Sequence, residues 1–167
     1  GGISFANTDG TNTTPGPEGA NPIWLDAENL LVTGGGGLQR VRADGEERAT
    51  LVGSSSVTLP SLSADKQKIA YLDGNLGHVF VSGVLGERQT RVLPRDLSSG
   101  LTANSRPSLS PDGGWLLVEA GPFLYLAPTD GSGPPLPVVG SEGVSQPAWV
   151  FEGGLESPPS ISVSGYE

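Results

Sequence analysis

The sequence predicts an all-β chain built from about four copies of a four-stranded unit, on three observations. Helix is disfavoured, because 26 Gly and 15 Pro make up about a quarter of the 167 residues and no apolar period of helical spacing lasts beyond one turn. A proline-led pattern recurs at Pro22, Pro60, Pro107 and Pro147, which are 38, 47 and 40 residues apart. Short apolar strands separated by glycine-containing turns follow these prolines.

The length, hydrophobic content and net charge of the chain indicate a single globular domain and argue against some classes of partner. The chain is long enough for one domain with a real core, and 35% of its residues are hydrophobic. A net charge of −9 with nine Lys plus Arg argues against nucleic acid or an anionic membrane as a partner. No apolar run is long enough to span a bilayer, and the first residues, GGISFANTDG, have neither the charged n-region nor the apolar h-region of a signal peptide.

The absence of cysteine and methionine carries two further expectations. Without cysteine there is neither a disulfide framework nor a cysteine-ligated metal site, and we expect no cofactor. Without methionine, we expect the chain to be a processed form, an engineered segment or a fragment. The acidic, cysteine-free composition with a Ser/Thr/Gly/Pro surface favours a cell-envelope or extracellular location.

The repeat is consistent from one copy to the next. A large apolar residue stands two positions after each proline, at Trp24, Leu62, Leu109 and Trp149, and we assign these four to the repeat core. Strand two follows at 30–32, 69–72 and 115–118, and strand three at 38–41, 78–81 and 123–126. Strand four is expected in RATLV (48–52), QTRVL (89–93) and LPVV (136–139).

Four short strands in about 40 residues are typical of a β-propeller blade, a small sheet packed between its two neighbours. Apolar runs such as WLLV (115–118) fit a sheet that is covered on both faces. We therefore predict one propeller-like domain over 1–167. Its parts are an N-terminal strand and polar connection (1–20), three blades (21–56, 57–100 and 101–143) and a partial fourth blade (144–167).

One copy shows a family resemblance. The stretch SLSPDGGWLLV (108–118) resembles the WD40-like PD40 repeat of TolB-like β-propellers and, more loosely, the propeller of LpqB-type lipoproteins. The matching stretches read LDAE in the first copy, SADK in the second and VFEG in the fourth. In SPDG, Asp112 and Gly113 are expected to form a two-residue hairpin turn, since Gly readily adopts positive φ. The resemblance implies a propeller over about residues 20–150.

The two ends predict complementary parts of a blade. ISFANTDG (3–10) aligns with LYLAPTDG (124–131), a third strand and its turn, whereas SISVSG (160–165) reads as one further strand after Pro147. The ends either close a four-bladed ring as one composite blade, belong to a larger propeller of six to eight blades, or pair between subunits.

The segment TNTTPGPEGAN (11–21) is polar, rich in proline and without periodicity. We interpret it as an exposed connection. Asn12, Thr13 and Thr14 also fit the N-glycosylation acceptor pattern, but a turn-forming loop accounts for the same residues.

Catalytic chemistry is not expected. His78, the single histidine, lies within a predicted strand, and no Gly-x-Ser-x-Gly elbow occurs. The candidate carboxylates sit in predicted turns, where aspartate caps the backbone. They are Asp26, Glu28, Asp44, Glu46, Glu47, Asp65, Asp112 and Asp130. No calcium-loop motif is present, and TGGGGLQR (33–40) fits a glycine-rich hairpin better than a phosphate cradle.

Six arginines form the one distinctive charge pattern. They fall on predicted third and fourth strands and their turns, at the outer edge of the blades. Such a rim would attract an acidic partner on an otherwise acidic molecule, although charges also protect sheet edges from pairing. The candidate interaction rim comprises Arg40, Arg42, Arg48, Arg88, Arg91 and Arg95.

These observations favour a non-enzymatic β-propeller module that acts as a protein-interaction scaffold. Two other functions are compatible with the same residues. One is a structural subunit whose end strands pair between chains to build an oligomer or filament. The other is the accessory propeller of a larger hydrolase, whose catalytic domain would lie elsewhere.

Overall fold

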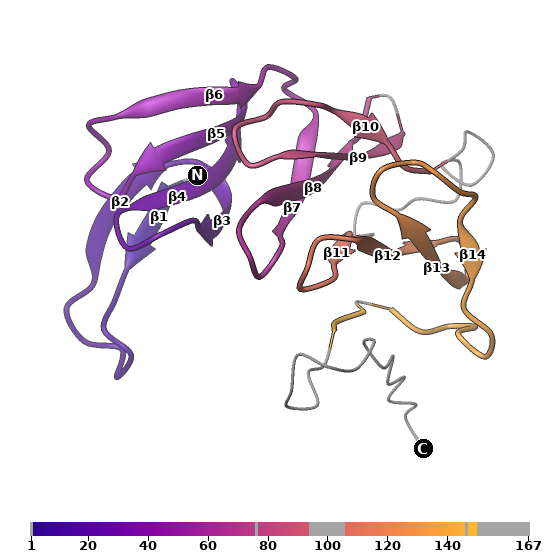
Figure 1. Cartoon of the computed structure of the whole chain (residues 1–167). Coiled ribbons are helices and arrows are strands. Elements are labelled where there is room, and N and C mark those ends of the chain that lie inside the picture. The colour runs from indigo at the N-terminus through magenta and orange to yellow at the C-terminus, as the bar shows by residue number, and fades with distance from the viewer. Residues whose placement is uncertain (1, 76, 94–105, 146, 150–167) are drawn as a thin grey trace.

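A computed structural model describes residues 2–75, 77–93, 106–145 and 147–149. This part of the chain is all-β and contains three four-stranded antiparallel sheets and one two-stranded sheet (Figure 1). We call the four-stranded sheets blades 1 to 3. Each is a simple meander in which strands neighbouring in sequence pair with each other. An all-β, propeller-like arrangement of four-stranded units is thereby confirmed.

The strands lie where the repeat predicts them. Blade 1 consists of β3 (Ala20–Trp24), β4 (Asn29–Gly34), β5 (Gly37–Arg42) and β6 (Arg48–Val52). Blade 2 consists of β7 (Val57–Leu62), β8 (Lys68–Asp73), β9 (His78–Gly83) and β10 (Thr90–Arg91). Blade 3 consists of β11 (Ser108–Leu109), β12 (Trp115–Ala120), β13 (Phe123–Pro128) and β14 (Leu136–Pro137).

The strand pairings share one register. Trp24 pairs with Leu30 in blade 1, Leu62 with Ile69 in blade 2, and Leu109 with Leu116 in blade 3. In each case the partner is the second residue of strand two. Since side chains directly opposite each other point to the same face of a sheet, the three residues hold equivalent places.

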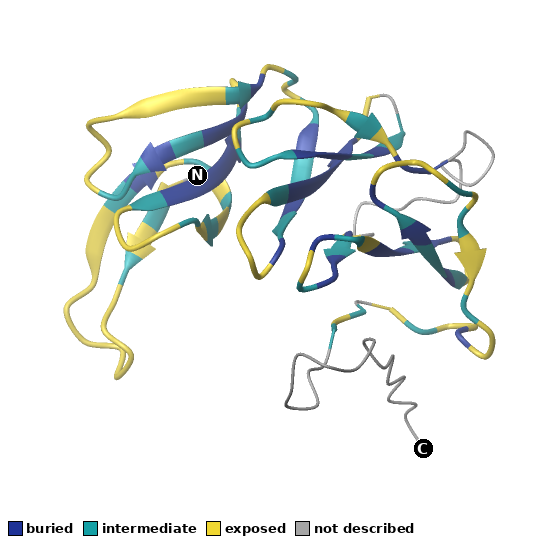
Figure 2. Cartoon of the chain, in the orientation of Figure 1, coloured by how far each residue is buried: buried dark blue, intermediate teal, exposed yellow. Residues whose placement is uncertain are grey.

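Alternation along strand two builds the core between the blades. In β8, Ile69 and Tyr71 pack in a cluster with residues of blade 1, whereas Ala70 and Leu72 pack in a cluster with blade 3. A strand that is covered on both faces has no polar side, which explains its continuous apolar sequence. Buried residues are concentrated on β4, β8 and β12, while β6 is largely exposed (Figure 2).

The N-terminal sheet is a hairpin of β1 (Gly2–Phe5) and β2 (Thr14–Glu18). The interpretation of residues 11–21 as a connection is therefore wrong for residues 14–18, in β2, and for residues 20 and 21, in β3. Pro15 and Pro17 occur in an edge strand, where a proline costs no ladder hydrogen bond on the outward side. Asn12 lies in the exposed loop of this hairpin at φ 54°.

The glycine-rich stretch forms the β4–β5 hairpin. Gly34 pairs with Gly37, so residues 35 and 36 make the tight turn. Gly37 has φ +94°, and a Cβ there would lie 1.9 Å from the carbonyl oxygen of Val52. The hairpin interpretation of residues 33–40 is confirmed, and glycine at 37 is required by the approach of the neighbouring backbone.

The SPDG turn is longer than predicted. Ser110 donates its backbone N–H to the carbonyl of Trp115, so the loop has four residues (111–114) rather than two. Gly113 has the expected positive φ of 66°. The loop is held by side chains: the Ser110 hydroxyl donates to Asp112 at 2.6 Å and accepts from the Trp115 N–H at 2.8 Å. This side-chain bonding stabilises a wider loop than a two-residue turn.

The corresponding turn of blade 2 repeats this design with Ser63 and Asp65. Polar contacts at these turns also link the blades. The Lys68 ammonium donates to the Gly113 carbonyl at 2.9 Å and to the Thr129 hydroxyl at 2.8 Å. The Asp65 N–H donates to the Pro111 carbonyl at 3.2 Å. Blades 2 and 3 are therefore joined by apolar packing and by directed hydrogen bonds.

The blades lie side by side in an open arc, with the β1–β2 hairpin beyond blade 1 and blade 3 at the other end (Figure 1). No strand pairing joins the hairpin to blade 3 among the described residues. Closure of a four-bladed ring therefore stays a prediction. The expected strand at 160–165 lies outside the described residues.

Candidate functional site

The predicted arginine rim is divided between two blades. Arg40 and Arg42 lie on β5 and Arg48 on β6, all in blade 1. Arg91 lies on β10 of blade 2, and Arg88 precedes it in the β9–β10 turn at φ 52°. Arg95 falls outside the described residues.

Arg42 is neutralised by its own turn. Its guanidinium lies 2.5 Å from Asp44, 2.7 Å from Glu46 and 3.2 Å from Glu47. The hydrogen bond with Asp44 raises the pKa of Arg42 and lowers the pKa of Asp44. With three carboxylates around one cation, this part of the rim has no positive charge to offer a partner.

Arg48 has a structural role. Its guanidinium donates to the side-chain oxygen of Gln39 and, at 2.8 Å, to the backbone carbonyl of Glu18. Glu18 ends β2, so this contact links the N-terminal hairpin to the outer strand of blade 1. Sequence reasoning identified the arginine but not its partners, because they lie 9 and 30 residues away.

Within the described part of the chain, no carboxylate neutralises Arg40, Arg48, Arg88 or Arg91. Arg48 is held by neutral oxygens, which leaves Arg40, Arg88 and Arg91 as the cations considered for binding. Arg40 pairs across the sheet with Leu31, whose side chain packs toward blade 2. The turn that carries Arg88 lies close to Leu51 of blade 1, since a Cβ on Gly86 would lie 2.3 Å from the Leu51 carbonyl oxygen. Arg40 and the turn that carries Arg88 therefore lie on the sides of blades 1 and 2 that face each other. Arg91 approaches Nε2 of His78 at 3.4 Å.

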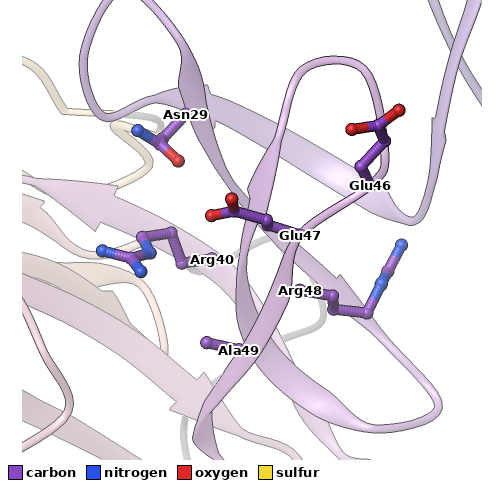
Figure 3. A pocket seen from close by; sticks show the side chains of 6 residues that line it. All are labelled: Asn29, Arg40, Glu46, Glu47, Arg48 and Ala49. Carbon is purple, nitrogen blue, oxygen red and sulfur yellow. The ribbon is translucent and has the colours of Figure 1, made fainter.

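A polar depression of about 380 Å³ opens on the outer edge of blade 1. Arg40 and Asn29 extend into one side, Arg48 and Glu46 lie on the other, and Glu47 stands between them (Figure 3). The Asn29 amide is already bound to Asp26 at 2.9 Å. Arg40 is therefore the group here that is left to bind an anionic ligand.

The aspartates considered as candidate acid–base residues accept hydrogen bonds from backbone N–H groups. Asp26 accepts the N–H groups of Glu28 and Asn29, both at 2.8 Å, and the first of these contacts does most to lower its pKa. The Ser110 hydroxyl does most to lower the pKa of Asp112. Asp130 likewise binds Ser132, which lowers its pKa. These carboxylates cap turns, as their positions in the sequence indicated.

One buried carboxylate was missed. Asp73 ends β8 and is 5% exposed. It accepts hydrogen bonds from the hydroxyls of Ser54, at 2.9 Å, and Ser56, which lie in the linker between blades 1 and 2. The sequence YLDG resembles any strand followed by a turn, so no local signal separates this aspartate from exposed ones. Its contacts fix the linker.

The four repeat-core residues are covered to very different extents. Leu109 is 6% exposed and Leu62 is partly buried. Trp149 is partly buried, and its indole N–H donates to the carbonyl of Ser108 at 3.0 Å. Trp24, predicted as a core residue, is instead 50% exposed. Its ring is tilted against that of Phe5, with the ring centroids 5.6 Å apart.

Two kinds of feature are absent from the described residues. No group of three or more His, Cys, Asp or Glu side chains gathers there in a way that would hold a metal ion. Across the same ranges, no helix has the length and apolar character needed to cross a membrane.

Comparison with known proteins gives no family. No protein-family model matches the chain, and no curated protein matches it. Among solved structures, the GH74 enzyme of Niastella koreensis is similar over 65% of this chain and 19% of its own, at 14% identity and a TM-score of 0.43.

Two further structures are similar. An auxiliary nutrient binding protein from Bacteroides thetaiotaomicron matches at 12% identity and a TM-score of 0.37, over 81% of this chain and 45% of its own. An oligogalacturonate lyase in complex with manganese matches at 14% identity and a TM-score of 0.36, over 74% and 52%. The chain therefore spans between about a fifth and a half of these proteins. The GH74 enzyme and the lyase are β-propeller-type proteins.

Proposed function

We propose that this chain is a non-enzymatic module of PD40 or TolB-like type that serves as a protein-interaction scaffold in a cell-envelope or secreted complex. Its partner is a protein segment rich in Asp and Glu. This segment binds at the outer edge of blades 1 and 2.

The observation that carries the proposal is the uneven neutralisation of the rim. Arg42 is surrounded by three carboxylates, whereas Arg40, Arg88 and Arg91 have none within the described part. The chain has a net charge of −9, and in the proposed complex these three cations contact the partner's carboxylates. Cations without carboxylate partners steer an acidic partner toward one face and set its orientation.

The polar chemistry of the described residues supports binding rather than catalysis. Asp26, Asp112 and Asp130 are occupied with backbone N–H groups, and His78 faces the guanidinium of Arg91. The depression in blade 1 instead presents a guanidinium, a group that pairs with carboxylates in bidentate geometry.

The test uses a fluorescein-labelled decamer of glutamate as probe and follows its fluorescence anisotropy at low salt. The parent chain should bind it. The charge-reversal variant Arg40→Glu/Arg88→Glu/Arg91→Glu should bind at least about tenfold more weakly, because attraction becomes repulsion. Added salt should weaken binding by the parent chain.

Arg106→Glu is the matched control for the single reversal Arg40→Glu. It changes the net charge by the same amount, but Arg106 is exposed in front of blade 3 and outside the rim, so probe affinity should fall much less than with Arg40→Glu. A triple variant that binds like the parent, or a parent chain that does not bind the probe, would overturn the proposal.

A further inference from the structure

A second polar depression, of about 470 Å³, lies where β2 meets blade 1. Residues 18–20, which connect β2 to β3, form one side, and residues 33–36, at the end of the β4–β5 hairpin, form another. Gln39 and Arg48 complete the lining. The three arginines proposed to bind an acidic segment do not line it, and the Arg48 guanidinium points away from Arg40 (Figure 3).

The glycine-rich turn offers two backbone donors to this depression. Gly34 pairs with Gly37, so Gly35 and Gly36 form the turn itself. The N–H groups of these two glycines have no hydrogen-bond partner among the described residues. Around Gly34 and Gly35 the space that a side chain would take is empty, so a ligand can approach the backbone closely. The turn therefore suits a ligand that accepts hydrogen bonds.

Two side chains add donors that are only partly used. Arg48 donates to the Gln39 side-chain oxygen and to the Glu18 carbonyl, and other N–H donors of its guanidinium stay unused. Both acceptors are neutral, so the positive charge of Arg48 is held but not neutralised in the described part of the chain. Gln39 is 8% exposed, and its amide nitrogen donates one N–H to the Thr50 hydroxyl at 3.4 Å. The second N–H of this buried amide favours an acceptor in the depression.

Glu18 supplies the opposite charge. It is exposed, and its carboxylate forms no ion pair within the described ranges. Its backbone carbonyl lies 2.8 Å from the Arg48 guanidinium, so the two charges stand within one side-chain length of each other without pairing. An anion alone would be attracted by Arg48 and repelled by Glu18. A ligand with a carboxylate and an ammonium group close together complements both charges.

We propose that this depression binds a free α-amino acid. The carboxylate of the ligand accepts hydrogen bonds from the Arg48 guanidinium and from the N–H groups of Gly35 and Gly36. Its ammonium group donates to the Glu18 carboxylate. Binding here is independent of the acidic segment, because none of the arginines assigned to that partner takes part.

Three small probes separate the charges of such a ligand. Glycine carries both groups, acetate carries the carboxylate alone, and methylammonium carries the cation alone. Each is titrated at neutral pH, in a phosphate-free buffer without amines or carboxylates, into the nitrogen-15-labelled chain, and the amide signals of Gly35 and Gly36 are followed by NMR. Glycine should shift both signals and bind at least about threefold more tightly than either partial probe. The amide of Gly121, in the equivalent β12–β13 hairpin, should not move.

Glu18→Gln tests the contact with the ammonium group. The Glu18 side chain has no partner among the described residues, so the variant should fold like the parent. It should bind glycine about three- to fivefold more weakly, as for the loss of one exposed ion pair, and should bind acetate no more weakly than the parent does. Glu28→Gln is the matched control. It removes the same charge from the exposed β3–β4 turn of blade 1 and should bind glycine like the parent.

Several results would overturn the proposal. If acetate or methylammonium bound as tightly as glycine, a single charge would account for binding. If Glu18→Gln bound glycine as the parent does, the ammonium contact would not exist. A shift at Gly121 as large as those at Gly35 and Gly36 would show unspecific binding. A parent chain whose Gly35 and Gly36 signals stay unchanged at millimolar glycine would have no such site.

Discussion

Leu109 and Trp24 occupy the same place in two blades, and they differ in what faces them. Both pair with the second residue of strand two. Leu109 faces a complete blade and is 6% exposed, whereas Trp24 faces a two-stranded hairpin and is 50% exposed. The larger of the two side chains is therefore the more exposed one. Burial in this fold depends on the neighbouring blade more than on the residue.

This difference follows from how repeat proteins are stabilised. Each unit contacts its neighbours and buries its apolar face against them, so a unit at an incomplete interface loses cover while keeping its own strands. Blades 1 and 2 have a neighbour on both faces, and their strand-two residues are buried on both. If burial depends on the neighbouring unit, changes at different interfaces should alter the stability of the chain by different amounts.

Deleting residues 1–10 should have the largest effect. The deletion removes β1 and takes Ile3 and Phe5 away from Leu30, Val32 and Val41, which leaves one face of blade 1 open to water. We expect a loss of about 2 to 5 kcal/mol in the free energy of unfolding, measured by urea titration. A truncated chain with the midpoint of the parent would show that the hairpin contributes nothing to blade 1.

Truncating Leu109 and Trp24 to alanine should lower the free energy of unfolding by different amounts, because a neighbouring blade covers Leu109, whereas half of Trp24 is exposed. Leu109→Ala should cost about 2 to 5 kcal/mol, because it leaves a cavity between blades 2 and 3. Trp24→Ala should cost about 1 kcal/mol, since half of the ring already contacts water. Both values come from urea unfolding at low protein concentration. Equal losses would contradict the comparison.

Tyr71→Phe should be neutral or stabilising by about 1 kcal/mol. The Tyr71 hydroxyl is buried between blades 1 and 2 and has no hydrogen-bond partner among the described residues, which is costly. Burial, with Asp73 nearby, raises its pKa to about 12. The folded chain thus holds this proton more tightly than the unfolded chain does. Stability should fall as pH rises from about 10 to about 12, and Tyr71→Phe should remove that dependence.

Asp112→Asn should have the smallest effect, confined to acid. Hydrogen bonds from Ser110 and from the Gly114 N–H lower the pKa of Asp112 in the folded chain. Its stabilising contribution is therefore present above the unfolded pKa and lost as pH falls through the lower folded value. Thermal unfolding between pH 2 and pH 5 should show a shallower loss for Asp112→Asn. If Asp112→Asn and the parent lost the same thermal stability between pH 5 and pH 2, the Ser110–Asp112 contact would not stabilise the turn.

The strand pattern could be predicted because it is local and repeated. Strand two of each blade is a continuous apolar run, and the four-glycine stretch predicts its hairpin directly. The β2 strand could not be predicted. Its sequence TPGPE has the composition of a loop, and it becomes a strand because β1 supplies the pairing. Tertiary context here overrides propensity.

The sequence predicted which arginines make up the rim, but not which of them are neutralised by carboxylates. Outer-strand positions for the arginines follow from the repeat, yet the sequence does not distinguish Arg42, held by its own turn, from Arg40, which has no carboxylate partner in the described part. The exposure of Trp24 could not be predicted either, because it depends on how much of the ring the N-terminal hairpin covers. Properties set between blades cannot be inferred from the register within one blade.

Thiol labelling tests the difference in burial between Trp24 and Leu109 most directly, because the parent chain has no cysteine. Trp24→Cys and Leu109→Cys are each mixed with a thiol reagent at low protein concentration, and the rate of modification is followed. At position 24 the thiol should react nearly as fast as one in a short peptide. At position 109 it should react about a hundredfold more slowly, because the site opens only when blades 2 and 3 separate. Similar rates at the two positions would contradict the dependence of burial on the neighbouring blade.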